Sequence, residues 1–445
     1  MSDYMFMLES HLNAEQNRVV AEVQAAASAA NANLFLTGGA MRDMLGGFPI
    51  RDLDFTVEGN PLKLAKTVLD KLGGKLGDKP AAQSEDEHRR FVDLGLPGGI
   101  TAQIAMSRRE RYARPGGKPH VTPATIYEDL RRRDFTIDAI ALSLNRGSRG
   151  LLIDPVNGLA DLGNRELRTA YPQAFSDDPC RLLRLVRLRH RLQFAVEERT
   201  ARQFENALEA GLQRLILERA LFAELRNIAE EPSPLDVLRD LEKLHLLALF
   251  SRSLTAANLN AAALTKLEKL RKTLPLGTIG GFGSWRMFLA VLTEKLSTRE
   301  KADLYRAMAM TKEEIGSGKK LADHAQKLER SLKSASLQKP SHVYQALAEV
   351  PADQILYLLF YSQQRIVHDR IRHYLQKYMP AAKEITDAEV EAAGARPGTA
   401  AFQKAREQLI AARLNGRPKR PDPVAPEPLP VNGARVTGAR GSVRQ

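Results

Sequence analysis

Two acidic residues near the amino end, Asp52 and Asp54, are spaced as a pair that could hold metal ions. They lie in residues 52–57, where polar and apolar residues alternate, a pattern typical of a half-buried strand. Successive side chains of a strand point to opposite faces, so both carboxylates project from the same side. Such a pair repels unless divalent cations join it, and two cations can hold the attacking and leaving oxygens of a phosphoryl transfer. We therefore predict that Asp52 and Asp54 are catalytic residues and metal ligands.

A pair of glycines precedes these acids where a strand is expected to turn into a helix. Residues 34–37 form a short apolar run that predicts the strand, and Gly38 and Gly39 follow it directly. Because glycine has no side chain, its amides and the N-terminus of the next helix can approach a triphosphate closely. Arg42 could clamp the same group by charge-assisted hydrogen bonds. We predict that Gly38, Gly39 and Arg42 bind the nucleotide.

A second cluster occupies residues 131–139, where three consecutive arginines precede an apolar segment. This arrangement would place cationic side chains beside the predicted strand that carries Asp52 and Asp54. Arg133 could donate to the hydroxyl groups of a ribose and Asp134 could accept from them, so we predict that both bind the nucleotide. The alternative is a solvated basic helix start with its apolar residues packed inward.

A third cluster begins with Asp178 at the start of a predicted helix and continues at steps of three with Arg181, Arg184 and Arg187. Cytosine and adenine both offer an amino donor beside a ring-nitrogen acceptor. An acid next to an arginine would therefore accept these bases and reject guanine and uracil. We predict that Asp178 and Arg181 read the base and that Arg184 and Arg187 bind the triphosphate. The alternative is a surface helix stabilised by salt bridges.

These three clusters, in this order, resemble the motifs of the class II tRNA nucleotidyltransferase and bacterial poly(A) polymerase family. Residues 154–162 are similar to the hinge motif of that family, and residues 217–225 are similar to its neck motif. The resemblance extends over residues 33–250 and is faint beyond them.

The resemblance implies a template-independent enzyme that adds CCA, or its terminal A, to tRNA 3′ ends from CTP and ATP, releasing pyrophosphate. It implies Mg²⁺ as the cofactor, held by Asp52 and Asp54, and the acceptor arm of tRNA as the partner. Two rival activities stay open within the family, namely addition of A alone and poly(A) synthesis. A rival of another class is a non-catalytic RNA-binding protein that kept the fold.

Three details of the sequence bear on these rivals. Residues 111–129 fill the place of a flexible loop that CC-only members lack, so terminal A addition is expected. Residues 57–61 resemble the subgroup that includes A-only enzymes and lack the basic signature associated with poly(A) polymerases. Gln103 stands where many members carry an acid, which puts a third metal-supporting carboxylate in doubt.

The elements that must position these residues are of two kinds. Strand and helix signals mix up to residue 154, with helices expected up to residue 30 and at 40–45 and 62–72, and a hairpin around residues 97–99. Beyond residue 161 the strand signals disappear. Amphipathic helices are predicted at 178–193, 198–210, 215–230, 234–249, 258–272, 284–295, 298–309, 311–334, 341–349, 352–378 and 399–414.

We therefore predict an α+β fold in which a head with a mixed sheet is followed by an all-helical neck and body. The resemblance implies that the head is a nucleotidyltransferase of the polymerase-beta-like type. The expected limits are 1–155 for the head, or catalytic palm, 156–250 for the neck with the base-reading helix, and 251–415 for the tRNA-binding body. Residues 416–445 predict a flexible, basic, proline-rich tail.

The composition is that of an ordinary globular protein. The 445 residues are 43% apolar and 27% charged, which excludes wholesale disorder. A formal net charge of +13 favours a polyanionic partner such as nucleic acid. The single cysteine, Cys180, excludes an internal disulfide framework and suits a reducing cytoplasm. No apolar run approaches the length of about 18 residues that a membrane-spanning helix needs, so we expect a cytoplasmic protein without membrane contact.

Overall fold

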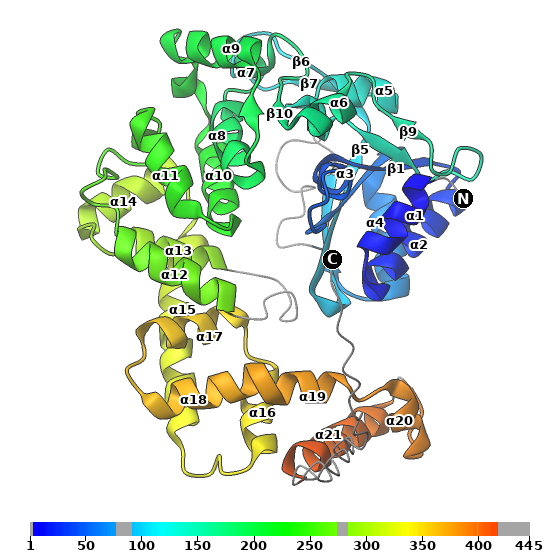
Figure 1. The fold of residues 1–445 in the computed structure, drawn as a ribbon, viewed down its shortest axis with the longest axis vertical. Helices are drawn as coiled ribbons and strands as arrows, with labels where there is room; N and C mark the ends of the chain where they lie inside the picture. Colours follow the sequence, from blue (N-terminus) through cyan, green and yellow to red (C-terminus); the bar gives the residue numbers. More distant parts are fainter. Residues whose placement is uncertain (1–2, 77–90, 274–283, 398, 417–445) are drawn as a thin grey trace, which may run out of the picture.

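The computed structural model describes residues 3–76, 91–273, 284–397 and 399–416. Figure 1 shows these residues as an open arc, with the head and its sheet at one end. The last two helices, α20 (Asp387–Ala392) and α21 (Ala400–Asn415), lie at the other end. The tail predicted at 416–445 lies outside the described residues except for Gly416.

A seven-stranded mixed sheet forms the centre of the head. Neighbouring strands are antiparallel except β2 and β5, which run parallel. In order across the sheet, the strands are β3 (Lys75–Leu76), β4 (Phe91–Leu96), β5 (Ile100–Met106), β2 (Leu53–Glu58), β1 (Asn33–Thr37), β8 (Ala141–Ser143) and β9 (Leu152–Ile153). The hairpin predicted around residues 97–99 is confirmed, since the single turn η1 (Pro97–Gly99) joins β4 to β5.

The sheet has an apolar face and a polar face, and strand β2 displays both. Leu53, Phe55 and Val57 are buried in the head core, where each contributes about 1.5–3 kcal/mol of hydrophobic free energy. Because side chains alternate along a strand, Asp54 and Thr56 lie on the opposite face. The alternation thus fixes the side of the sheet on which the polar groups gather.

Two helices, α2 (Ala14–Ala29) and α4 (Pro61–Leu72), contribute apolar side chains to the same core. Asn13 begins α2 with a capping box, in which its side chain accepts from the Gln16 N–H and the Gln16 side chain accepts in return. Asn60 caps α4 by accepting from the Leu62 and Lys63 N–H groups. The other helices of the head are α1 (Asp3–His11), α3 (Gly38–Leu45), α5 (Ile126–Arg131), the turn η2 (Thr136–Asp138) and α6 (Gly158–Asn164).

A separate antiparallel hairpin, β6 (Arg108–Arg111) and β7 (His120–Pro123), spans most of the segment for which a flexible loop was predicted. Its connecting segment reaches the helical part of the chain. The Gly116 N–H donates to the Ser176 carbonyl over 2.9 Å. Residues 111–129 therefore form most of a hairpin and the start of a short helix, and the turn of the hairpin contacts Ser176.

Beyond the head the described chain is mainly helical. The helices are α7 (Ala174–Asp177), α8 (Cys180–Leu192), α9 (Glu198–Glu209), η3 (Leu212–Leu215), α10 (Glu218–Glu230), α11 (Pro234–Lys243), η4 (Leu247–Leu249), α12 (Ala261–Thr273), α13 (Ser284–Leu292), α14 (Thr298–Ala307), α15 (Lys312–Lys333), α16 (Pro340–Ala348), α17 (Ala352–Tyr361), α18 (Arg365–His373), the π-helical turn η6 (Tyr374–Tyr378) and α19 (Met379–Lys383).

Two expectations about this helical part are wrong. The strand signals do not end at residue 161, because β10 (Glu166–Leu167) and β11 (Ala195–Val196) form a short parallel pair. The single helix expected at 352–378 is interrupted after Tyr361. Ser362 adopts an extended backbone there, and its hydroxyl donates to Glu329 over 2.5 Å. A polar side chain that finds its partner on another helix stabilises this break.

Helix α8 belongs to two hydrophobic cores at once. One set of its side chains, Leu182, Leu185, Leu188 and Leu192, is buried with the sheet and helices of the head. Leu183 and Val186 are buried instead with α10, α11 and the helices that follow. The two cores therefore meet along a single helix, which also carries the arginines predicted to bind nucleotide.

The fold class is confirmed as α+β, with a mixed sheet in the head and a helical remainder. Within the described ranges, the helices are too short or too polar to cross a membrane.

Candidate active site

A cavity of about 380 Å³ opens between the polar face of the sheet and the start of helix α8. Five arginines and five acidic residues line it, so both hydrogen-bond donors and acceptors are available at its wall. The lining comes from strand β2, from the start of α3, from the β6–β7 hairpin, from the segment after α5, and from α8. Segments far apart in the sequence thus converge on one polar site.

Gly38, Gly39 and Asp54 form the part of the cavity nearest the sheet. The backbone of Gly38 has a φ of +61°, a region that favours glycine. A Cβ atom on Gly39 would lie 3.2 Å from the Oδ2 atom of Asp54, so a side chain there would crowd the carboxylate. The backbone N–H of Ala40 donates a hydrogen bond to Asp54. The glycines therefore let the N-terminus of α3 come close to this carboxylate.

Asp52 and Asp54 differ in their surroundings. Asp54 is half-buried and lines the cavity, whereas Asp52 is exposed and accepts from the Thr101 hydroxyl. Burial and the neighbouring charge of Asp52 raise the pKa of Asp54 to about 6, although Arg133 and Arg42 oppose the shift. The arginines near Asp54 therefore neutralise its negative charge only in part.

The chemistry of this pair suits a divalent cation. Mg²⁺ is commonly bound by one or two carboxylates together with waters and substrate phosphates. A cation would offset both the burial of this carboxylate and its repulsion by Asp52, which together raise the pKa of Asp54. Nowhere in the described ranges do histidine, cysteine and acidic side chains gather in groups of three or more that could hold a metal ion, so Asp52 and Asp54 form a pair only.

Arg42 lies beneath the cavity wall rather than in it. Its guanidinium forms an ion pair with Asp43 over 2.9 Å and with Asp138 over 2.6 Å. Asp138 lines the cavity, and Arg42 is 5% exposed. The structure therefore links Arg42 to the site through Asp138.

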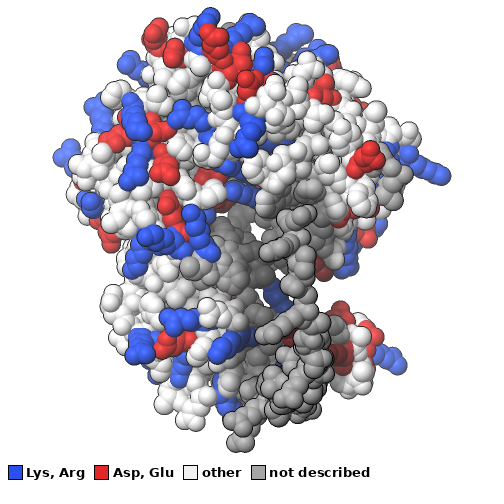
Figure 2. All heavy atoms as spheres, in the orientation of Figure 1, with Lys and Arg blue, Asp and Glu red and all other residues white. Residues whose placement is uncertain are grey.

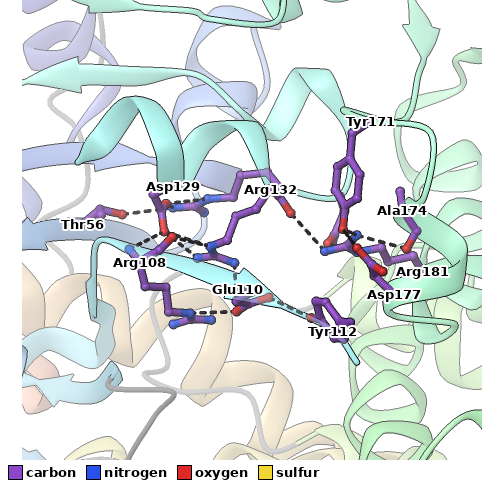
Figure 3. A network of polar contacts seen from close by, with 12 residues as sticks. Thr56, Arg108, Glu110, Tyr112, Asp129, Arg132, Tyr171, Ala174, Asp177 and Arg181 are labelled. Carbon is purple, nitrogen blue, oxygen red and sulfur yellow. Dashed lines mark hydrogen bonds and ion pairs between the residues drawn. The ribbon is translucent and has the colours of Figure 1, made fainter. Parts of the chain in front are cut away.

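Arg133 is held at the cavity by a buried acid. Asp129 is fully buried, and its two oxygens accept hydrogen bonds from Arg132 over 2.6 Å and from Arg133 over 2.7 Å. Burial opposes the ionisation of Asp129, but Arg133 and Arg132 hold its pKa well below the usual range. Arg133 also donates to the Thr56 hydroxyl over 3.1 Å, which ties it to strand β2. Figure 3 shows Asp129 between Thr56, Arg108 and Arg132.

Asp134 connects the head to helix α8. Its carboxylate forms an ion pair with the Nε atom of Arg181 over 2.5 Å and a second one with Arg184. Arg181 is 2% exposed, and its Nη2 atom donates to the Arg132 carbonyl over 3.1 Å. Two residues predicted to bind different parts of a nucleotide, Asp134 and Arg181, therefore contact each other directly.

Asp178 lies just before helix α8, whereas Arg187 lies within it. Asp178 lines the cavity, and its Oδ1 atom accepts from the Cys180 N–H over 3.1 Å. Arg187 lies outside the lining and is buried between Glu224, at 2.6 Å, and Glu231, at 2.9 Å. Burial opposes its charge, but these two acids raise the pKa of Arg187.

The structure thus brings most of the predicted site residues together. Eight of them line the cavity: Gly38, Gly39, Asp54, Arg133, Asp134, Asp178, Arg181 and Arg184. The three that do not are Asp52, Arg42 and Arg187.

Three cavity residues that sequence reasoning missed, Arg108, Glu110 and Tyr112, come from the β6–β7 hairpin. Glu110 accepts from Arg108 over 2.8 Å and from the Tyr112 hydroxyl over 2.8 Å, and it forms an ion pair with Arg132 over 3.2 Å. Burial opposes its ionisation, but Arg132 and Arg108 lower the pKa of Glu110 to about 2. Figure 3 shows how Glu110 joins the hairpin to Arg132. Residues 108–111 are all charged and match no motif, so the sequence gives no signal that singles out Glu110.

Gln103 lies beside Asp54 on the neighbouring parallel strand. Its side-chain amide donates to Asp93 over 2.8 Å, and Asp93 is its partner on the next strand, β4. The side chain beside Asp54 is therefore the amide of Gln103, and the nearest acid in this direction, Asp93, lies one strand further away on β4.

Charges of both signs are mixed on the face drawn in Figure 2. Lysine and arginine side chains there are interspersed with aspartate and glutamate rather than separated into one basic patch.

Comparison with known proteins finds similarity that is concentrated in the head. Residues 34–168 match the family model described as the poly A polymerase head domain. The A-adding tRNA nucleotidyltransferase of Halalkalibacterium halodurans is 34% identical over 281 residues, which are 62% of this chain and 63% of that protein. The CC-adding tRNA nucleotidyltransferase of Deinococcus radiodurans is 35% identical over 209 residues, 47% of this chain and 53% of that protein. The chain therefore spans less than two thirds of these curated relatives.

The fold is also found in a solved structure. An apo form of a CCA-adding enzyme superimposes with a TM-score of 0.52 at 25% sequence identity, covering 94% of this chain and 96% of that one. Together with the head-domain match, this likeness confirms the family resemblance that the three sequence clusters indicate.

Proposed function

We propose that this chain, whose residues 34–168 match the poly A polymerase head domain, is a template-independent tRNA nucleotidyltransferase. It would add CCA, or its terminal A, to the 3′ end of tRNA from CTP and ATP and release pyrophosphate. One observation carries the proposal: Asp54 and the glycine turn share a cavity with Asp178 and Arg181. Groups suited to phosphate and groups suited to a base edge thus lie in one site.

Asp52 and Asp54 would hold Mg²⁺, as the raised pKa of Asp54 favours. When bound, the metal would stabilise the charge that develops on the attacking and leaving oxygens. Gly38 and Gly39 would let the amides at the start of α3 approach the phosphates. Arg184, at the cavity wall, would supply a further positive charge for the triphosphate.

Asp178 and Arg181 would select the base. The Asp178 carboxylate would accept from the amino group that cytosine and adenine share, and Arg181 would donate to the adjacent ring nitrogen. Guanine and uracil present a carbonyl and an N–H at these places, so both contacts would be lost. Arg133 and Asp134 would contact the ribose, with Asp134 also holding Arg181 in place.

The sequence predicts that Arg187 and Arg42 bind the nucleotide, but we propose structural roles for both. Arg187 would stabilise the neck through Glu224 and Glu231. Arg42 would orient Asp138 at the cavity wall. The helical part beyond the head would hold the acceptor arm of the tRNA. We also propose a cytoplasmic location, because the one cysteine, Cys180, fits a reducing compartment.

Addition of A alone is the second candidate function. It is favoured by the A-adding relative, which is 34% identical over 62% of this chain. The presence of the β6–β7 hairpin, in the region that CC-only members lack, argues against CC addition alone. Poly(A) synthesis is a third possibility within the same reaction type.

The test offers CTP and ATP, separately and together, to one tRNA that ends before CCA and another that ends in CC. We expect both tRNAs to be completed to CCA. Growth of only the tRNA ending in CC would establish A-only addition, and long A tracts on unrelated RNA would establish poly(A) synthesis. Absence of incorporation on every RNA, with Mg²⁺ present and the fold intact, would refute the proposed function.

A further inference from the structure

Tyr171 contacts Arg181 in two ways. The Nη1 atom of Arg181 donates to the Tyr171 hydroxyl over 2.6 Å. The guanidinium carbon also lies 5.4 Å from the centre of the tyrosine ring, which is within the range of a cation–π interaction. Figure 3 shows the ring of Tyr171 pointing toward Arg181 and Asp177. Tyr171 belongs to none of the three sequence clusters.

The hydroxyl of Tyr171 is oriented by an acid on its other side. It donates to the Oδ2 atom of Asp177 over 2.9 Å. Because a hydroxyl has one proton, donation to Asp177 turns a lone pair of the oxygen toward Arg181. Burial raises the pKa of Tyr171 to about 12, and Arg181 opposes that shift only in part, so the proton stays in place at neutral pH. Asp177, Tyr171 and Arg181 therefore form a directed chain of hydrogen bonds.

This chain helps to fix the plane of the Arg181 guanidinium, together with the ion pair between Nε and Asp134. Both N–H donors of Nη1 are used, one by the Tyr171 hydroxyl and one by the Ala174 carbonyl over 3.0 Å. One N–H of Nη2 is used by the Arg132 carbonyl. A base in the cavity would meet the second N–H of Nη2, which these contacts do not use. The direction of that N–H depends on how the rest of the group is held.

We infer that Tyr171 is a positioning residue for nucleotide selectivity, which it exerts by aiming Arg181 at the base. The inference rests on the proposed function and extends it to a residue that would not touch the nucleotide. Without the hydroxyl, one N–H of Nη1 loses its partner, and the guanidinium is held only by Ala174, Arg132 and Asp134. The second N–H of Nη2 is then directed less narrowly, so it distinguishes less well between the acceptor atoms of different bases.

Tyr171→Phe tests this inference, because it keeps the ring and removes only the hydroxyl. Equilibrium binding of CTP, ATP, UTP and GTP without RNA is measured first, followed by kcat and KM for incorporation. Loss of a hydrogen bond to a charged group should lower the preference for CTP and ATP over UTP and GTP by about tenfold or more. The change should lie mainly in the nucleotide KM, with tRNA affinity and Tm close to those of the wild type.

Asp177 supplies two companion variants. Asp177→Asn keeps an oxygen that can accept from the Tyr171 hydroxyl, so selectivity should be retained. Asp177→Ala removes the acceptor and should shift selectivity in the same direction as Tyr171→Phe. Tyr374→Phe, which alters a buried tyrosine of the body, is the matched control and should leave nucleotide preference unchanged.

The outcomes separate this inference from the proposed function. Selective nucleotide binding that Tyr171→Phe weakens supports the inference, even if no RNA is extended. Selectivity within twofold of the wild type in both Tyr171→Phe and Asp177→Ala overturns it, whether or not the enzyme adds nucleotides to tRNA. A wild-type protein that binds all four triphosphates equally would also overturn it, because Arg181 would then read no base.

Discussion

The Nε atom of Arg181 and the Oδ1 atom of Asp134 form an ion pair 2.5 Å long, which joins helix α8 to the segment after helix α5. The same carboxylate also pairs with Arg184. One acid of the head therefore orients two guanidinium groups of the neck at the cavity. Nucleotide binding and the contact between head and neck consequently depend on the same side chains.

Replacing Arg181 should remove the choice of nucleotide. In Arg181→Ala no donor faces the ring nitrogen of the base, so kcat/KM for CTP should approach that for UTP, a loss of about tenfold or more in preference. Arg189→Ala changes an arginine on the same helix that pairs with Asp240, and it serves as the control. Steady-state incorporation with each triphosphate gives the answer. An Arg181→Ala enzyme that still prefers C and A over U would remove the proposed role.

Arg184 and Arg187 should respond to substitution in different ways. Arg184 lines the cavity, so Arg184→Ala should raise the nucleotide KM by about tenfold with little change in Tm. Arg187 is buried against two buried acids, so Arg187→Met should lower the free energy of unfolding by about 3–5 kcal/mol. Thermal unfolding and nucleotide titrations on both variants check this. Equal Tm values for Arg187→Met and the wild type would contradict the structural role.

Asp54→Asn should abolish incorporation while making the metal-free fold more stable. Burial and Asp52 raise the pKa of Asp54 to about 6, so its charge at pH 7 costs about 3 kcal/mol relative to the unfolded chain. The amide has no charge and avoids this cost, but it is a poorer metal ligand. Urea unfolding in EDTA and single-turnover incorporation measure the two effects. Activity within tenfold of the wild type would exclude Asp54 as a metal ligand.

The dependence on Mg²⁺ should change with pH through the same carboxyl group. Protonation of Asp54 stabilises the metal-free fold fully below a pH of about 4, and this contribution is lost as the pH rises through about 6. Protons therefore compete with the metal below pH 6. The Mg²⁺ concentration for half-maximal activity should rise by about tenfold per pH unit there. A requirement that stays constant between pH 5 and pH 7.5 would count against this competition.

Asp129 should be essential for stability although no ligand is expected to touch it. Its fully buried carboxylate holds Arg132 and Arg133, and Asp129→Ala would leave both cations without this partner, at about 3–5 kcal/mol. Because its pKa is depressed, its contribution is present above a pH of about 4 and is lost as the pH falls further. Chemical unfolding at pH 7 measures the loss. Asp303→Asn, at an exposed pair, should change stability little.

The sequence predicts the parts of the site that depend on local periodicity. The alternation along β2 is enough to separate Leu53, Phe55 and Val57 from Asp54, and the glycine pair marks the start of α3. It also assigns the α+β class, because strand signals cluster before residue 154 and amphipathic helices follow. These features need no knowledge of which segments meet in space.

Other features depend on long-range contacts and could not be predicted. An α-helix turns by about 100° per residue, so Arg187, six residues after Arg181, points about 120° away from Arg181 around α8. Steps of three thus bring Arg181 and Arg184 to the cavity and carry Arg187 away from it. Arg42 is diverted by Asp138, which is 96 residues away in the sequence. Glu110 and Tyr171 carry no motif, because their importance lies in the arginines that they hold.

Helix α8 has a practical consequence for any attempt to divide this protein. Its leucines on one side complete the core around the sheet, while Leu183 and Val186 complete the core of the helices beyond. A fragment that ends before α8 would leave the sheet without one wall. A fragment that ends after α8 would expose Leu183 and Val186 to water, and such an exposed apolar surface promotes aggregation. We therefore expect that the head and the helices after it must be expressed and purified together to stay folded.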